Sequence, residues 1–241
     1  MMPIKNFNKK QKLGEIVSIF PKAADLFMQN QIDFCCGGDR TLEYAAKERG
    51  IEVREILDQL EALYEDYRAR ANDETDWRTA KYSDIIDFIE NTHHAFLKKE
   101  LPVTEELVTK ILKVHFIDNG ESLTKVHKLF SQLKSELEMH LIKEEQSLFP
   151  MIKEYEKNPS DELLDKIVDE IVETEDEHDV AGDILKELRQ VTNNYNVPST
   201  GCATFELTYK KIQAIESDLF RHIHLENNVL HERLKKEREN R

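Results

Sequence analysis

Four long stretches of this chain carry apolar residues at intervals of three and four positions, and residues that break helices are scarce. The stretches cover about residues 82–100, 121–155, 161–192 and 203–237. The 241 residues include only 7 glycines and 6 prolines, less than half of the usual share. Sheet folds need turns that are rich in these residues. The pattern therefore predicts an all-α protein in which the long helices pack as an antiparallel four-helix bundle.

Two residues mark expected interruptions in the bundle. Pro102 should bend or end the first helix, because proline lacks the backbone N–H that a helix interior requires. A shorter helix then covers about residues 104–116, and Gly120 separates it from the second long helix.

The first seventy residues predict a separate small helical domain. Apolar periodicity indicates three short helices and a longer one over residues 53–70. Residues 71–76 are then polar, and we interpret 71–77 as a linker. The predicted domains are therefore 1–70 and 78–241.

An excess of acidic residues limits the classes of partner. The chain has 48 acidic and 34 basic residues, which give a net charge of −14. Nucleic acids and anionic membrane surfaces both attract basic proteins. In addition, no apolar run approaches the length of a membrane span, and residues 1–12 lack a signal-peptide core. We therefore expect a cytoplasmic protein that binds neither nucleic acid nor membranes.

Ionisable residues occupy positions that should form the core of the bundle. The seam of the fourth helix consists of Ile215, Leu219, His222, Glu226 and Val229. The seam of the second helix repeats this feature with His140 and Glu144, and the seam of the third contains His178.

A metal ion would compensate for burying these groups. Burial without a partner costs roughly 2–7 kcal/mol for a neutral polar group and more for a charge. Residues i and i+4 of a helix differ by about 40° and one turn, so each His-x-x-x-Glu pair aims both side chains at one place. One such pair is commonly a surface pair or a satisfied core histidine, but two copies on core seams indicate a metal centre. Nitrogen and oxygen donors without thiolate favour iron, then manganese or zinc.

The first helix should supply a fourth histidine, and His93 and His94 are the candidates. On a helical wheel that includes Ile85, Ile89 and Phe96, His93 lies nearer than His94 to the arc of apolar residues. Periodicity alone therefore selects His93.

Five motifs resemble those of a known family. They are DFCCGG at 33–38, THHAFLKKELP at 92–102, HLIKEEQSLFPMI at 140–152, EDEHDVAG at 175–182 and HIHLENNVL at 222–230. In this order, over nearly the whole chain, they resemble the iron–sulfur cluster repair di-iron proteins, also called the Repair of Iron Centres family. These are hemerythrin-like proteins with an N-terminal cysteine-containing domain, and their bundle holds a non-haem di-iron centre.

The resemblance implies a set of ligands, motif by motif. They are His94, His140, His178 and His222, with Glu144 and Glu226 as bridges. The motif selects His94 rather than His93, and a distorted helix would explain the discrepancy. The implied cofactor is two iron ions, for which we expect an oxo bridge.

The implied ligand set differs from that of oxygen-carrying hemerythrins, which are similar in fold. Those proteins use more histidines, including a second one on the third helix, whereas here the position four before His178 is Thr174. Fewer imidazole ligands leave more open coordination and hold the metal more weakly. Both effects favour reaction or iron donation over reversible oxygen carriage.

Other polar residues near the seams have simpler interpretations. We expect Glu145 and His231 to be exposed, and His115 to lie at the surface or near the end of the bundle. Glu175 shares the seam of His178, so a hydrogen bond to a ligand is plausible there.

Three cysteines, two of them adjacent, do not form a disulfide framework and indicate a reducing compartment. Cys35 and Cys36 precede a helix expected near Thr41, and a helix N-terminus favours the thiolate. Adjacent cysteines bridge each other only with strain. The pair could shuttle electrons, exchange disulfides with a partner, or bind iron or nitric oxide; alternatively, Cys35 is structural. Cys202 is expected to be structural.

Two functions fit these features. The first, implied by the resemblance, is repair of iron–sulfur clusters damaged by oxidative or nitrosative stress, through iron donation, nitric oxide handling such as its reduction, or both. Cys35 and Cys36 would then serve a redox or docking step. Partners would be damaged iron–sulfur proteins or the cluster assembly machinery and an electron donor, and the linker would permit a homodimer. The alternative is an oxygen or nitric oxide carrier or sensor, which has no use for paired thiols.

Overall fold

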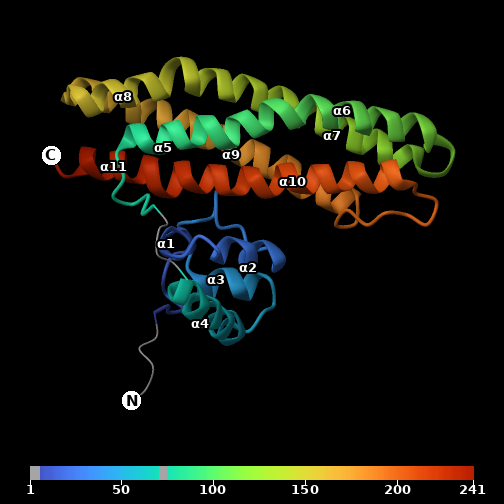
Figure 1. Ribbon diagram of the computed structural model, residues 1–241, viewed down its shortest axis with the longest axis horizontal. Coiled ribbons are helices and arrows are strands. Elements are labelled where there is room, and N and C mark those ends of the chain that lie inside the picture. Colours follow the sequence, from blue (N-terminus) through green and yellow to red (C-terminus); the bar gives the residue numbers. More distant parts are fainter. Residues whose placement is uncertain (1–5, 71–74) are drawn as a thin grey trace. The chain divides into compact units, whose positions relative to one another are not determined.

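A computed structural model describes residues 6–70 and 75–241 of the chain, and it is all-α over this part (Figure 1). This confirms the predicted fold class. Contacts divide the described chain into two compact units. One consists of residues up to Lys81 together with Phe220–Arg241, and the other is Tyr82–Leu219. Within the predicted linker, residues 71–74 lie outside the described residues.

The N-terminal part of the first unit consists of four described helices. They are α1 (Leu13–Ile19), α2 (Ala23–Gln29), α3 (Leu42–Glu48) and α4 (Val53–Arg70). Local sequence fixes their ends: the Thr41 hydroxyl accepts a hydrogen bond from the backbone N–H of Tyr44 and so caps α3. Gly50 follows α3 with φ +67°, a conformation that favours glycine.

A core rich in phenylalanine holds the first unit together. Its fully buried aromatic residues are Phe7, Phe20, Phe27 and Phe34. The end of the last long helix belongs to this unit, and the Phe220 ring lies 6.2 Å from the Phe34 ring in an edge-to-face arrangement.

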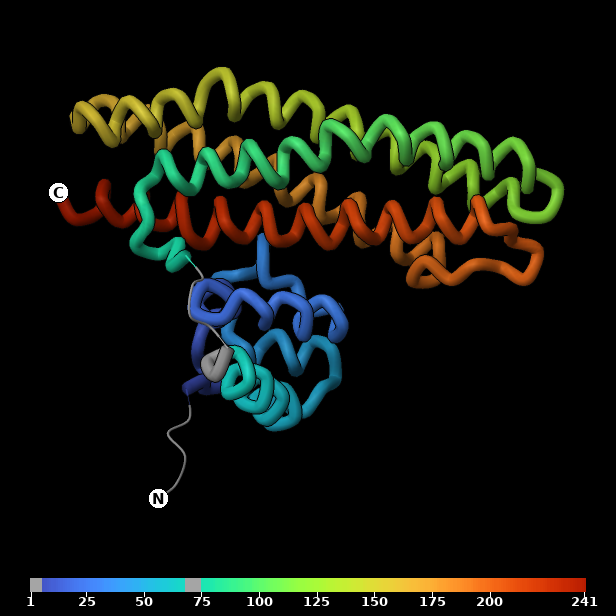
Figure 2. The backbone as a smooth tube through the Cα atoms, viewed as in Figure 1, coloured from blue at the N-terminus to red at the C-terminus, as the bar shows by residue number. Residues whose placement is uncertain are grey.

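The second unit consists of long helical runs that lie side by side (Figures 1 and 2). The first run is α5 (Tyr82–Ile89), η1 (Glu90–His94) and α6 (Ala95–Val114), and the second is α7 (Phe116–Lys143), η2 (Glu144–Leu148) and α8 (Phe149–Lys157). The third is α9 (Asp161–Val191), and the fourth begins with α10 (Ala203–Leu225). The last helix continues through η3 (Glu226–His231) and α11 (Glu232–Glu239), which belong to the first unit. Helix α7 packs against both α6 and α9.

The predicted helix end near Pro102 is wrong, whereas the predicted break near Gly120 is confirmed. Helix α6 continues through Pro102, where the neighbouring Leu101 and Thr104 are fully buried. Their packing outweighs the cost of a proline inside a helix, about 3 kcal/mol, which comes from the lost backbone hydrogen bond and from the clash of the ring with the preceding turn. Helix α7 runs from Phe116, but its backbone is not helical at Asn119 (φ −133°), so two helices meet there across a kink, one residue before Gly120.

Within the described chain, π-helical turns interrupt three of the helical runs. They are η1, η2 and η3, and they contain His94, Glu144 and Glu226 respectively. A π-turn closes its hydrogen bond over five residues instead of four, so it changes the direction of the side chains that follow. The predicted ligands of these runs therefore lie where the helical period departs from 3.6.

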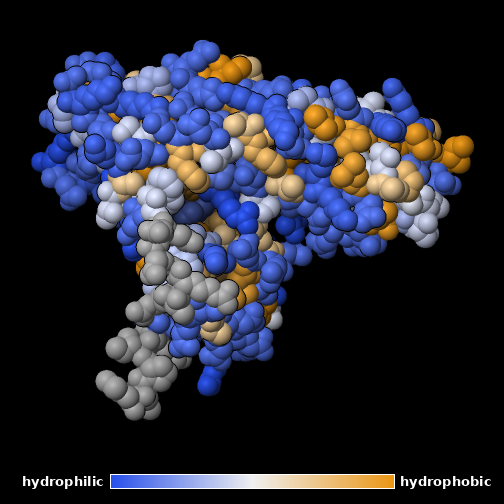
Figure 3. Space-filling model, in the orientation of Figure 1, coloured by the Kyte–Doolittle hydropathy of each residue, from blue (hydrophilic) through white to orange (hydrophobic). Residues whose placement is uncertain are grey.

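The face of the protein seen in Figure 3 is mainly polar. Hydrophilic side chains cover most of the face visible in Figure 3, consistent with the net charge of −14. None of the described helices is both long and apolar enough to cross a membrane.

Candidate metal centre

In the bundle, three predicted ligands converge on one buried carboxylate. The Oε2 atom of Glu144 lies 3.3 Å from Nε2 of His94 and 3.3 Å from Nε2 of His140. The Nε2 atom of His178 lies 3.1 Å from Nε2 of His140. All four side chains are buried. The inner nitrogens of three imidazoles thus face the same small region.

Carboxylates outside this region fix the orientation of two of the rings. Nδ1 of His94 lies 2.8 Å from Oε1 of Glu145, and Nδ1 of His140 lies 2.7 Å from Oε2 of Glu177. Protonated at Nδ1, each ring donates outward and turns its Nε2 lone pair inward, the orientation that a metal ligand needs.

The two outer carboxylates are held in their charged form. Partial burial alone would raise the pKa of Glu145, but hydrogen bonds from Lys98 and His94 outweigh it and lower that pKa. The hydrogen bond from His140 lowers the pKa of Glu177 against the opposing effect of burial. Both groups are therefore good acceptors for the Nδ1 protons.

The last helix contributes a second His-x-x-x-Glu pair. Nε2 of His222 lies 2.9 Å from Oε1 of Glu226, and both side chains are fully buried. His222 is near the end of α10, and Glu226 is the first residue of the π-turn that continues it.

Among the described residues, the potential ligand atoms form two overlapping groups in the bundle. The first consists of His94, Glu144, His222 and Glu226, and the second of His140, Glu144, His178 and Glu226. Within each group the ligand atoms lie within 4.8 Å of one another. Each group has its own two histidines, and both include the same two glutamates. The structure thus brings together all six residues that the motifs selected.

These residues fit a metal ion. Buried carboxylates need a cation or a full set of hydrogen bonds, and here they are surrounded by imidazole nitrogens, which bind metals when neutral. The donor set contains nitrogen and oxygen but no sulfur, which suits iron, manganese or zinc.

His93 lies outside these groups. Its Nδ1 atom lies 3.0 Å from Oδ1 of Asp218, and its ring contacts that of Phe88 edge-to-face. The π-turn Glu90–His94 explains why a helical wheel selects His93 whereas the structure places His94 in a ligand group: one residue more per turn brings His94 to the place where an α-helix would present His93.

Two expectations about nearby polar residues need correction. Glu145 is not an exposed helix residue, because it contacts His94, and His231 is fully buried. The carboxylate that accepts a hydrogen bond from Nδ1 of His140 belongs to Glu177, a residue that the sequence analysis did not select. Glu175, which the sequence analysis selected, is half-buried. Thr174 donates its hydroxyl to the backbone oxygen of Glu170.

The adjacent cysteines lie in a turn of the first unit. Cys35 is buried and Cys36 is half-buried. The Sγ atom of Cys35 donates to Oδ1 of Asp33 at 3.3 Å. Burial raises the pKa of the Cys35 thiol well above its usual value, and the neighbouring Cys36 adds to the effect. The expectation that a helix N-terminus favours the thiolate therefore fails for Cys35.

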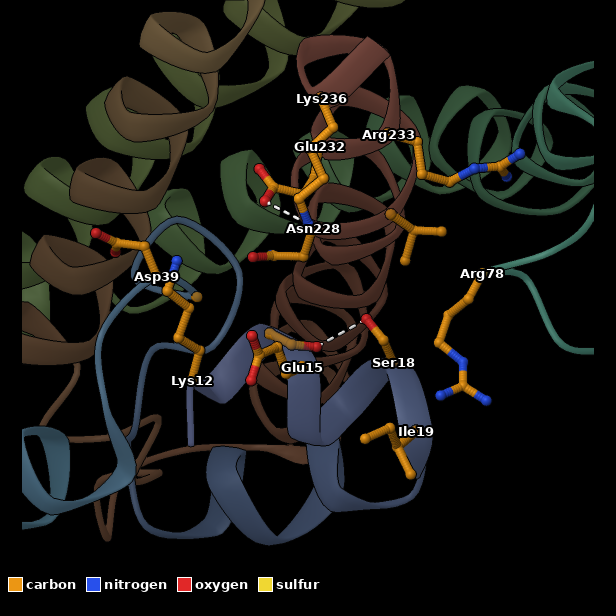
Figure 4. A pocket seen from close by; sticks show the side chains of 13 residues that line it. Lys12, Glu15, Ser18, Ile19, Asp39, Arg78, Asn228, Glu232, Arg233 and Lys236 are labelled. Carbon is orange, nitrogen blue, oxygen red and sulfur yellow. Dashed lines mark hydrogen bonds and ion pairs between the residues drawn. The ribbon is translucent and has the colours of Figure 1, made fainter. Parts of the chain in front are cut away.

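Asn228 of the last helix holds this turn. Its Nδ2 atom donates to the backbone oxygen of Cys35 at 3.0 Å. Its Oδ1 atom lies so close to Gly14 and Gly38 that a Cβ atom added there would be only 2.3 and 2.1 Å away. A larger residue at either position would displace the Asn228 side chain. Asn228, Gly14 and Gly38 also line a pocket of about 330 Å³, whose charged side chains include Lys12 and Arg78 (Figure 4).

Cys202 differs from the structural cysteine that we expected. Its side chain is exposed, and its Sγ atom lies 3.3 Å from Nε2 of the buried His115. The hydrogen bond with His115 lowers the pKa of Cys202 to about 7.

Comparisons with known proteins agree with this architecture. A model of the ScdA_N domain, described as a domain of unknown function (DUF542), matches residues 9–64, and one of the hemerythrin HHE cation binding domain matches residues 84–234. The chain is 36% identical over 222 residues to the iron-sulfur cluster repair protein YtfE of Citrobacter koseri, covering 92% of this chain and 95% of that protein. YtfE proteins of Escherichia coli O157:H7 and Enterobacter sp. (strain 638) show the same identity and coverage.

The chain belongs to the YtfE family. The match to the hemerythrin HHE cation binding domain includes all six residues of the two ligand groups, so both the domain and these residues fit a metal site.

Proposed function

We propose that this protein repairs damaged iron–sulfur clusters and that its bundle holds two iron ions for this purpose. Two observations support the proposal. The relatives that match nearly the whole chain are named as iron-sulfur cluster repair proteins. The single feature that carries the di-iron assignment is the sharing of Glu144 and Glu226 between two groups of ligand atoms.

The sharing of the glutamates suggests how two ions would be held. His94 and His222 would bind one ion, His140 and His178 the other, and the two carboxylates would bridge them. The bound ions would supply one-electron redox chemistry and a store of releasable iron. We expect an oxo bridge between them.

The residues of the chain set the charge of the site and the orientation of its ligands. Four imidazoles, neutral when they bind metal, and two carboxylates leave a buried site with two negative charges, so it attracts cations. Glu145 and Glu177 orient two of the imidazoles. Thr174 offers no strong ligand, because its hydroxyl donates to the Glu170 backbone oxygen. A site with few imidazoles favours release of iron or reaction at an open position over reversible oxygen binding.

The wider function follows from this centre. Clusters damaged by oxidative or nitrosative stress would regain iron from it, or nitric oxide would be removed there by reduction. Partners would be damaged iron–sulfur proteins or the cluster assembly machinery, with an electron donor, in the cytoplasm. Cys35 and Cys36 would serve a redox or docking step, and a homodimer is compatible with this arrangement. An oxygen or nitric oxide carrier is the weaker candidate, because the relatives' name specifies repair.

Removal of both shared carboxylates tests the proposal. The purified protein should bind about two iron ions and absorb in the near ultraviolet through oxo-to-iron charge transfer. The Glu144→Leu/Glu226→Leu variant should lose most of this iron and its ability to reactivate an iron–sulfur enzyme inactivated by nitric oxide. Its helices should remain, since leucine in place of a buried charge is often neutral or stabilising. Full iron loading of this variant would contradict the bridging assignment.

A further inference from the structure

The cysteine turn of the first unit brings three potential metal ligands together. The carboxylate of Asp33 and the thiols of Cys35 and Cys36 place one ligand atom each within 4.8 Å of one another. A zinc–sulfur bond is about 2.3 Å long, so sulfur ligands of a tetrahedral ion lie about 3.8 Å apart. The separations here exceed that spacing by no more than about 1 Å. Sγ of Cys35 is already 3.3 Å from Oδ1 of Asp33.

The backbone of the turn is fixed from several sides. Nη2 of Arg40 donates to the backbone oxygen of Asp33 at 3.1 Å, and its Nε donates to that of Gly37 at 3.3 Å. Asn228 holds the backbone oxygen of Cys35, as described above. The backbone N–H of Gly37 donates to Oδ1 of Asp33 at 3.2 Å. A turn held in this way keeps its side-chain donors in place before any ion arrives.

The local charges suit a divalent cation. Two thiolates and one carboxylate carry three negative charges, of which a divalent ion would neutralise two. The Arg40 guanidinium, which lies 3.9 Å from Asp33 and 2.7 Å from Glu48, stands near the third. Cys35 is only 2% exposed, so its thiolate needs such compensation. On binding, each thiol would release one proton to solvent while its sulfur forms the bond to the metal.

We propose that Asp33, Cys35 and Cys36 form a second metal site, which takes one thiophilic divalent ion, ferrous iron or zinc. Thiolate ligands select such ions over magnesium or calcium. Three protein ligands leave a fourth position of a tetrahedral ion open to a water or to a ligand from another molecule. The site is therefore suited to passing an ion on. A role in iron delivery rests on the proposed repair function, whereas metal binding at the turn does not.

Cobalt(II) provides the test. Reduced, full-length protein whose His/Glu centre is already filled with iron is titrated with cobalt(II) without oxygen. The increase in near-ultraviolet absorption from thiolate-to-cobalt charge transfer is measured. The His/Glu ligands of the bundle cannot produce this band, because they contain no sulfur. We expect the band to saturate at about one cobalt per chain and to disappear when zinc displaces cobalt.

Variants assign the band to the turn. Cys36→Ser should reduce its intensity by about half, and Cys35→Ser/Cys36→Ser should abolish it. Asp33→Asn should keep the band but weaken cobalt binding by more than roughly tenfold, since partners outside the ligand shell alone contribute that much. Cys202→Ser is the matched control and should leave it unchanged. Cys36 is half-buried, so its variant should fold even if substitution of buried Cys35 does not, and circular dichroism checks this.

The proposal is overturned if equimolar cobalt gives no thiolate band, or if the band persists in the double cysteine variant or disappears in Cys202→Ser. The iron content of the His/Glu centre is measured in the same samples. If the parent protein shows the cobalt band but holds no iron in the His/Glu centre, the proposed function is contradicted and the metal site at the cysteine turn is not.

Discussion

The Nδ1 atom of His94 lies 2.8 Å from Oε1 of Glu145, and Glu145 directly follows Glu144, whose carboxylate lies on the Nε2 side of the same ring. Two consecutive glutamates therefore contact opposite edges of one imidazole. The π-turn Glu144–Leu148 begins at these two residues. This short segment therefore supplies the predicted ligand Glu144 and, through Glu145, positions the predicted ligand His94.

Glu145→Gln should weaken metal binding while the protein stays folded. Glutamine still accepts a hydrogen bond, but it lacks the charge that makes the imidazole a stronger ligand. Loss of such a partner lowers metal affinity by about 10–100-fold, which equilibrium competition with a chelator would measure. Gln146→Ala, at the exposed neighbouring position, is the control and should bind as the parent does. Equal affinities of Glu145→Gln and the parent would show that the contact does not tune the metal.

The choice between adjacent histidines is tested by single substitutions. His94→Ala should reduce the iron content strongly or change the spectrum, since its Nε2 atom lies 3.3 Å from Glu144. His93→Ala should have a weak effect, because His93 contacts Asp218 instead. Iron analysis and absorption spectra of both variants decide the question. The opposite order would mean that helical periodicity was the better guide.

The different outcomes for these residues show what sequence periodicity can establish. His140, Glu144, His222 and Glu226 could be selected because spacing i, i+4 puts both members of a pair on one face of a helix. The choice of His94 required a motif, since a wheel with constant period fails across the π-turn Glu90–His94.

Contacts between distant segments could not be predicted. The partner of His94, Glu145, is 51 positions away, and the partner of Cys202, His115, is 87 positions away. Nothing in the local pattern of either segment specifies such pairs. Helix α6 likewise passes Pro102 because of packing that a local rule does not include.

Cys202 should be the fastest cysteine to alkylate, and its rate should report a lowered pKa. The thiolate is the nucleophile, and the pKa of Cys202 is about 7 because of the hydrogen bond with His115. Its alkylation by iodoacetamide should therefore rise through neutral pH and level off above it. Cys35, which is buried and has a raised pKa, should react slowly throughout.

His115→Ala is the matched variant for this measurement. Removal of the imidazole should move the midpoint of the Cys202 profile to higher pH and slow its alkylation at pH 7, as mass spectrometry of the labelled peptides would show. An unchanged profile would mean that His115 does not activate the thiol.

The Cys35→Ser/Cys36→Ser variant separates repair from carriage. None of the proposed ligands of the His/Glu centre is a thiol, so this variant should keep the iron of that centre and its oxidised spectrum. It should nevertheless lose most of its ability to reactivate a damaged iron–sulfur enzyme in a reconstituted assay, because the turn that would dock the client or pass an ion has lost its sulfur atoms. Cys202→Ser, at the third cysteine, should repair clusters as the parent does.

Each alternative gives a distinct result in the same assay. A carrier would show no repair even in the parent, and the double substitution would leave its binding of oxygen or nitric oxide unchanged. A variant that repairs clusters as fast as the parent would restrict the mechanism to the bundle and give the cysteine turn a purely architectural role. Loss of iron from the His/Glu centre would instead mean that the thiols help to load it. In that case an ion would bind first to Asp33, Cys35 and Cys36 and then reach the bundle. This order of loading could be followed by adding iron to the parent and to the variant and recording the oxo-to-iron band against time.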